Sequence, residues 1–164
     1  MFKLFTKNKN VTFELVAPIS GKLVDITEVP DPVFSQKMMG DGIAIQINEA
    51  TVVAPCDGEV TLIPDSKHAF GMKNEQGMEL LVHIGLETVA LAGEGFKSLV
   101  DQGAHVAKGT PIIQLNKAFI ESKGINLITP LVIINHDQFD LTTMNLNNNV
   151  VAGETVVISY TKKQ

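Results

Sequence analysis

Two histidines near the middle of the chain carry the residue type best suited to chemistry. His68 and His83 flank a segment, residues 74–77, whose Asn-Glu-Gln-Gly sequence is typical of a turn between strands. Imidazole is neutral and nucleophilic near pH 7, so it can accept a phosphoryl group, act as a base or bind a metal. The pair is therefore the first candidate for a functional site.

The strands on either side of this turn would bring the two rings together. If the loop is centred between residues 75 and 76, His68 lies directly opposite His83, with Cβ atoms about 4.5–5.5 Å apart. The same register predicts Phe70 opposite Leu81 on that face, as a small apolar patch. The other face, expected in the core, carries Leu80, Val82 and Ile84. A shift by one residue would separate the histidines.

Two kinds of site fit such a pair. A second imidazole could donate a hydrogen bond to a phosphoryl group held on the first, and paired histidines also bind zinc. The sequence has no His-x-His or His-Glu-x-x-His motif to complete a metal site. The residues alone leave the choice between phosphoryl carrier and metal site open.

The composition narrows the class of partner. The net charge is −5, and all 13 basic residues are lysine. This net charge argues against nucleic acid as the main partner, because binding to a phosphate backbone needs a basic surface. The absence of arginine also disfavours lasting retention of a nucleotide or free phosphate, for which bidentate arginine is common. The single cysteine, Cys56, is compatible with a reducing compartment.

The elements that would position the histidines are short and β-rich. Gly, Pro, Asn and Asp separate the apolar runs, which favours an antiparallel arrangement of strands. Short helical turns are expected only at residues 96–100 and 117–123. We predict an all-β fold, a flattened antiparallel β-sandwich or barrel, with a flexible tail at residues 1–10 and one domain over residues 11–164. The strands are expected at residues 13–17, 22–26, 43–47, 51–54, 59–63, 68–73, 78–84, 110–115, 127–134 and 154–160.

Two internal repeats predict pseudo-symmetry in this fold. Residues 15–23 resemble residues 52–60, each with Ala-Pro at the end of a strand and Gly three residues after the Pro. Residues 106–112 likewise resemble residues 151–158, each a tight turn followed by an apolar strand. We expect a pseudo-symmetric sandwich.

Residues 77–89 resemble the phosphohistidine signature of glucose-type enzyme IIA of the bacterial sugar phosphotransferase system. The signature requires Gly, an apolar run, His, an apolar residue, Gly, an apolar residue, any residue, Thr and an apolar residue, and every position is met. Further segments resemble the family in the same order, at residues 16–21, 29–34, 39–45, 67–70 and 93–96. The likeness covers roughly residues 11–135.

The resemblance implies a role for each candidate residue. His83 matches the phosphorylated histidine, which reacts through Nε2, and His68 matches the neighbour that assists transfer. Ser66 stands where the family has a hydroxyl residue that supports this neighbour. Hydrophobic docking positions are matched by Phe34, Phe70 and Leu81, and acidic docking positions by Asp31 and Glu87. The family more often has Asp at position 87 and an aromatic residue at position 81.

The implied activity is that of a phosphotransferase component with a covalent phosphohistidine intermediate and no cofactor. The histidine-containing phosphocarrier protein would be the donor, and a cysteine of an enzyme IIB domain of a membrane sugar permease the acceptor. No metal is expected, although His68 and His83 could bind zinc opportunistically. We expect a cytoplasmic protein, with membrane contact at most peripheral through Phe2, Leu4 and Phe5.

Three other classes of protein share some of these sequence features. A biotinyl- or lipoyl-type carrier needs a lysine at a hairpin tip, for which Lys73 is the nearest match. A zinc hydrolase needs a third ligand that the sequence does not supply. A regulatory binder that uses the same face is compatible with phosphoryl transfer and stays open.

Overall fold

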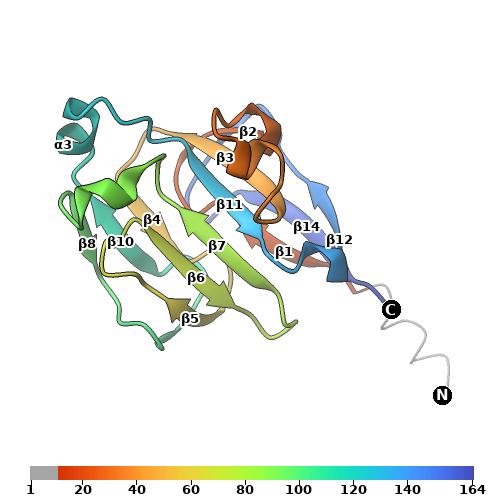
Figure 1. Cartoon of the computed structure of the whole chain (residues 1–164). Helices are drawn as coiled ribbons and strands as arrows, with labels where there is room; N and C mark the ends of the chain where they lie inside the picture. The colour runs from red at the N-terminus through yellow and green to blue at the C-terminus, as the bar shows by residue number, and fades with distance from the viewer. Residues whose placement is uncertain (1–10) are drawn as a thin grey trace, which may run out of the picture.

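The computed structural model describes residues 11–164 as three antiparallel sheets (Figure 1). The expected tail at residues 1–10, with its amphipathic stretch, lies outside the described residues. The all-β prediction is confirmed in the form of packed open sheets with little helix. Within residues 11–164, every helix is too short or too polar to cross a bilayer.

The large sheet has eight strands. In spatial order they are β13 (Asn149–Val150), β2 (Gly21–Asp25), β3 (Asp41–Ile47), β11 (Thr129–Ile133), β7 (Glu79–His83), β6 (Ala69–Lys73), β5 (Gly58–Leu62) and β9 (His105–Val106).

Two three-stranded sheets complete the β structure. One contains β1 (Phe13–Val16), β14 (Val156–Lys162) and β12 (Phe139–Thr143), and the other β4 (Thr51–Val53), β10 (Pro111–Leu115) and β8 (Phe96–Ser98). The connections hold α2 (Pro32–Ser35), α3 (Lys117–Ser122), and the 3-10 turns η2 (Ile26–Glu28), η3 (Thr88–Leu91) and η4 (His136–Gln138).

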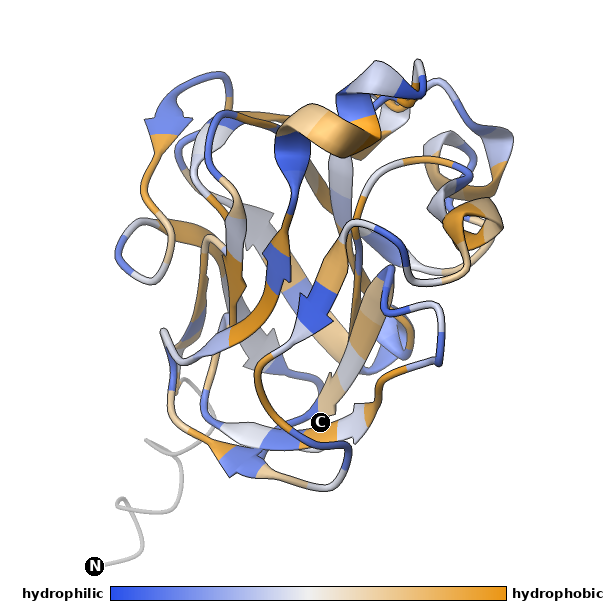
Figure 2. Cartoon of the chain, turned by 90° about the vertical axis from the view of Figure 1, so that its left-hand side faces the viewer, coloured by the Kyte–Doolittle hydropathy of each residue, from blue (hydrophilic) through white to orange (hydrophobic). Residues whose placement is uncertain are grey.

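Apolar side chains that alternate along the strands build the main core. Figure 2 shows hydrophobic and hydrophilic residues succeeding one another along the strands. Leu15, Ile45, Phe70 and Ile112 are among the fully buried members of this core. A second, smaller cluster of buried residues contains Val24, Phe34, Ala44 and Val132.

The ten strands predicted from the sequence are all present, with ends that differ by one or two residues. The helical turn expected at residues 117–123 is also present, as α3. The helical turn expected at residues 96–100 is wrong, because this segment contains strand β8, paired with β10. Phe96 is buried and Lys97 is exposed, which is the alternation of a strand. A run of five residues is too short for this alternation to be recognised in the sequence.

The predicted pseudo-symmetry appears in reciprocal hydrogen bonds between the two related turns. Val16 N donates to Pro55 O (2.9 Å), and Val53 N, the equivalent of Val16, donates to Pro18 O (2.7 Å). The second repeat supplies an equivalent bond inside each half, since Ala17 N donates to Thr155 O (2.8 Å) and Ala54 N donates to Thr110 O (2.9 Å). The first pair of bonds thus joins the two related turns reciprocally, and the second pair gives each turn the same partner in its own half.

The same relation extends to the sheets. Strands β13, β2, β3 and β11 in one half of the large sheet correspond to β9, β5, β6 and β7 in the other, and β1-β14-β12 corresponds to β4-β10-β8. An approximate two-fold axis thus passes between the central strands β11 and β7. The β2–β3 and β5–β6 connections are equivalent under this relation.

Candidate functional site

The β6–β7 hairpin has a register one residue away from the predicted one. Ala69, not His68, lies opposite His83, and Phe70 lies opposite Val82. Phe70 consequently points into the core and is fully buried. The expectation that Phe70 is a docking residue is wrong for this reason. Leu80, Val82 and Ile84 do point into the core, as predicted.

The turn explains the difference in register. Asn74 N donates to Met78 O (3.1 Å), and Gly77 N donates to Asn74 O (3.0 Å). The loop therefore has three residues, 75–77, instead of being centred between residues 75 and 76. The side chain of Asn74 stabilises it, since its Oδ1 accepts hydrogen bonds from the N–H groups of Gln76 and Met78.

His68 nevertheless lies beside His83, because the chain bends before β6 begins. Lys67 has a left-handed conformation (φ 52°), and His68 itself lies in a bend outside the strand. Alternation along a strand therefore does not determine the direction of the His68 side chain. The two imidazole centroids are 5.0 Å apart with an interplanar angle of 81°. The predicted proximity is confirmed, through a bend and not through the register.

A backbone hydrogen bond determines the tautomer of His83. Its Nδ1 lies 2.8 Å from Gly85 O, and since a carbonyl can only accept, Nδ1 carries the proton. The lone pair is then on Nε2, which makes this atom the nucleophile. Burial lowers the pKa of the imidazole from its ordinary value of 6.5, opposed by the Gly85 hydrogen bond and by the Asp31 carboxylate. His83 is therefore neutral at neutral pH.

Ser66 supports the second imidazole. Its Oγ lies 2.5 Å from His68 Nδ1. If the hydroxyl donates this bond, Nε2 of His68 carries a proton that it can donate to an anion beside His83. Burial, and next the repulsion that a protonated His83 would exert, lower the pKa of His68, so this ring too is neutral at neutral pH.

The β2–β3 connection supplies one wall of the site. The Phe34 ring lies 5.1 Å from that of His83, centroid to centroid, and Phe34 is only 3% exposed. Asp31 caps the short helix α2 by accepting a hydrogen bond from Val33 N (3.0 Å). Phe34 thus packs against the His83 ring and offers little surface to a partner.

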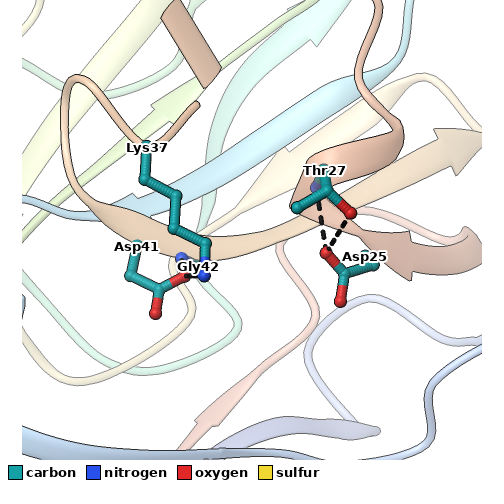
Figure 3. A network of polar contacts seen from close by, with 5 residues as sticks. All are labelled: Asp25, Thr27, Lys37, Asp41 and Gly42. Atoms are coloured by element: carbon teal, nitrogen blue, oxygen red, sulfur yellow. Dashed lines mark hydrogen bonds and ion pairs between the residues drawn. The ribbon is translucent and has the colours of Figure 1, made fainter. Parts of the chain in front are cut away.

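Polar contacts anchor this connection at both ends (Figure 3). At the start, Asp25 Oδ1 accepts hydrogen bonds from N and Oγ1 of Thr27, and these bonds lower the pKa of the Asp25 carboxyl. At the end, Lys37 forms an ion pair with Asp41 (3.4 Å), whose Oδ1 also accepts from Gly42 N. The segment that carries Asp31 and Phe34 is therefore held at its two ends.

The two histidines open into a shallow depression of about 410 Å³. The predicted residues Asp31, Phe34, Leu81 and Glu87 all line it with the histidines, and Ser66 adjoins it through His68. Glu87 is exposed, whereas Leu81 is 8% exposed. The structure thus brings together every predicted site residue except Phe70.

Sequence reasoning missed the exposed apolar residues of the rim. They come from three segments: Val33 and Met39 from the β2–β3 connection, Leu62 from the end of β5, and Val89 from η3. Val33, Met39 and Val89 lie inside the family-like segments 29–34, 39–45 and 77–89, which is the signal that could have found them. Leu62 lies outside every such segment.

The structure bears on two of the rival classes. Across the described part of the chain, no group of three or more His, Cys, Asp and Glu side chains is arranged to hold a metal. Lys73 ends strand β6 opposite Glu79 and is not at the hairpin tip, where a carrier lysine would stand. Cys56 is buried, and burial raises the pKa of its thiol to about 12, so it is a poor nucleophile.

Comparison with known proteins gives a consistent result. The family described as "phosphoenolpyruvate-dependent sugar phosphotransferase system, EIIA 1" matches residues 13–139. The glucose-specific EIIA component of Staphylococcus aureus is 45% identical over 161 residues, 97% of each chain, and that of Staphylococcus epidermidis is 44% identical over the same share. The solved structure of glucose permease IIA from Mycoplasma capricolum matches with a TM-score of 0.82 and 32% identity, over 92% of this chain and 96% of that one.

Proposed function

Because the chain belongs to the EIIA 1 family of the phosphoenolpyruvate-dependent sugar phosphotransferase system, we propose that Nε2 of His83 is the atom that carries the phosphoryl group. The protein is a phosphocarrier and phosphotransferase component of that system. The observation that supports the proposal is the 2.8 Å hydrogen bond from His83 Nδ1 to Gly85 O, which leaves Nε2 unprotonated and directed away from the backbone turn.

The proposed uptake step is a direct displacement. The Nε2 lone pair attacks the phosphorus of a phosphohistidine on the donor, an N–P bond forms, and the donor's N–P bond breaks with its electron pair returning to the donor imidazole. In delivery, a cysteine thiolate of the acceptor attacks the same phosphorus, and the electron pair of the His83 N–P bond returns to Nε2. Neither step needs a cofactor.

His68 stabilises the phosphoryl group during transfer. Its ring lies edge-on to His83 at 5.0 Å, within reach of a phosphoryl oxygen on Nε2. With the Ser66 hydroxyl as the donor to His68 Nδ1, the Nε2–H of His68 donates to the phosphoryl oxygen. Preorganised donors of this kind stabilise the charge that develops in transfer.

The depression receives the partner proteins. The proposed donor is the histidine-containing phosphocarrier protein, the proposed acceptor is an enzyme IIB domain of a sugar permease, and the proposed compartment is the cytoplasm. Val33, Leu62 and Val89 give them apolar surface to bury, and Asp31 and Glu87 favour basic side chains. The curated relatives are named glucose-specific, so glucose is the first sugar to test.

A labelling experiment tests the proposed site. With labelled phosphoenolpyruvate and the general enzymes of the pathway, the wild type should acquire an acid-labile phosphoryl group and His83→Gln should acquire none. His105→Gln is the matched control, since it makes the same chemical change at a histidine that lies exposed on β9. Labelling that persists in His83→Gln, or that disappears in His105→Gln, would place the phosphoryl group elsewhere.

A further inference from the structure

The backbone turn after strand β7 controls which nitrogen of His83 is free. Gly85 and Glu87 in this turn both have left-handed conformations (φ 75° and 60°). The turn directs the Gly85 carbonyl back at His83 Nδ1. An isolated imidazole exchanges its proton between the two nitrogens, so the position of this one carbonyl selects the tautomer.

Thr88 closes the turn from inside the protein. It is completely buried, and its Oγ1 donates a hydrogen bond to Ile84 O at 2.7 Å, across the residues that present Gly85 O. Its methyl group also fits against Gly85, because a Cβ added there would lie 2.9 Å from Thr88 Cγ2. Thr88 therefore contacts the turn through both branches of its side chain.

A second segment supports the turn from the other side. Leu86 N donates to Asn126 O at 2.9 Å, and Asn126 Oδ1 accepts from Ile128 N at 2.9 Å. Residues 126–128 therefore anchor one side of the turn, and the Thr88 hydroxyl anchors the side that follows His83 directly. Without the hydroxyl, the Ile84–Gly85 peptide, which directly precedes the peptide that carries Gly85 O, would lose its link to Thr88, and the turn would be held only through Leu86 N and Asn126 O.

We propose that Thr88 is a positioning residue whose hydroxyl, through Ile84 O and the Gly85 carbonyl, keeps His83 in the tautomer with a free Nε2. The inference rests on the proposed role of His83, but it concerns the unphosphorylated protein. A buried threonine with a purely structural role would affect stability and leave the tautomer unchanged. The nitrogen chemical shifts of the His83 ring distinguish a positioning role of Thr88 from a purely structural one.

The test measures the nitrogen chemical shifts of the His83 ring in the full chain at neutral pH, in wild type, Thr88→Val and Thr88→Ser. Valine keeps the shape and removes the hydroxyl; serine keeps the hydroxyl and removes the methyl group. We expect one tautomer with the proton on Nδ1 in the wild type and Thr88→Ser, and a mixture in Thr88→Val. Phosphoryl uptake by Thr88→Val should be slower by about two- to tenfold, the effect of one lost hydrogen bond.

Thr51→Val is the matched control, since it also removes a threonine hydroxyl that donates a hydrogen bond, to Gln114 Oε1 at 2.7 Å, but lies on β4, away from this turn. It should leave the His83 tautomer unchanged. The inference is overturned if folded Thr88→Val keeps a single Nδ1–H tautomer, if Thr88→Ser gives the mixture instead, or if Thr51→Val disturbs the ring equally. Failure of the proposed function gives a different result: wild-type His83 would have the expected tautomer and take up no phosphoryl group.

Discussion

The two imidazoles have different hydrogen-bond partners, and the difference separates their roles. His83 Nδ1 must donate to a carbonyl, so its Nε2 is a nucleophile. His68 Nδ1 faces a hydroxyl, which allows its Nε2 to be a donor. This difference in hydrogen bonding supports the proposal that His83 carries the phosphoryl group and His68 stabilises it.

This division predicts the phenotype of His68→Gln. We expect the variant to accept a phosphoryl group on His83, because the Gly85 hydrogen bond is unchanged. Delivery to an acceptor cysteine should be at least tenfold slower, because the transition state of transfer loses an oriented hydrogen-bond donor. Single-turnover transfer from the phosphorylated variant to an enzyme IIB domain measures this. Delivery at the wild-type rate would remove His68 from the mechanism.

The lowered pKa of His83 predicts how uptake and stability depend on pH. Uptake should stay constant as the pH falls to about 6.5, the ordinary value, and decrease only below the lowered pKa, since the ring is neutral until then. The free energy of unfolding should fall earlier, as the pH decreases from about 6.5 to the lowered pKa, because in that interval the unfolded imidazole binds a proton and the folded one does not.

The Asp31 carboxylate opposes this lowering, so Asp31→Asn should lower the pKa of His83 further. Asp25→Asn is the control: both aspartates cap a helical turn, and asparagine keeps the capping oxygen in both. Titration of the His83 ring by NMR measures the two variants. A rise in the pKa of His83 in Asp31→Asn, or equal shifts in both variants, would contradict the electrostatic role of Asp31.

At the scale of the elements, the sequence predicts where the strands lie better than it predicts the register in which they pair. The apolar runs locate all ten predicted strands and the helix α3, because burial dictates the residue pattern there. The register of β6 and β7 depends on one turn, in which Asn74 and Gly77 favour a three-residue loop. The sequence does not distinguish this loop from a two-residue one, and the choice decides whether Phe70 points outward or into the core.

The bend at Lys67 brings His68 into the site, which predicts a dependence on backbone conformation at that position. Lys67→Gly should leave phosphoryl delivery unchanged, since glycine adopts φ 52° readily. Lys67→Val should slow delivery, because a β-branched residue disfavours this conformation and would displace His68. Lys97→Val, on the exposed face of β8, is the control. Equal delivery by all three variants would show that the bend does not position His68.

At the scale of the whole molecule, the site lies where two equivalent connections meet. The β5–β6 connection presents Ser66 and His68, the β2–β3 connection presents Asp31 and Phe34, and His83 lies on one of the two central strands. The internal repeats allow the sequence to predict two related halves. They do not predict this convergence, because it depends on the long-range pairing of β7 with β11. Leu62, which lies outside every family-like segment, has no sequence signal that would place it at the site.

The contact between the halves predicts a specific cost for Gly153→Ala. Gly153 has φ 75°, and a Cβ there would lie 3.3 Å from Cα of Gly109 in the other half. Gly124 has the same φ and nothing within 4 Å of such a Cβ, so Gly124→Ala measures the cost of the backbone conformation alone, about 1–2 kcal/mol.

We expect Gly153→Ala to lower the free energy of unfolding by about 1 kcal/mol more than Gly124→Ala, because the two halves must move apart slightly to admit the methyl group. Unfolding in denaturant measures both variants. Phosphoryl uptake on His83 should be unchanged in each, since neither glycine lines the depression. If the two substitutions cost the same, the close approach of Gly109 and Gly153 contributes nothing to how the halves pack, and the pseudo-symmetric contact is incidental to stability.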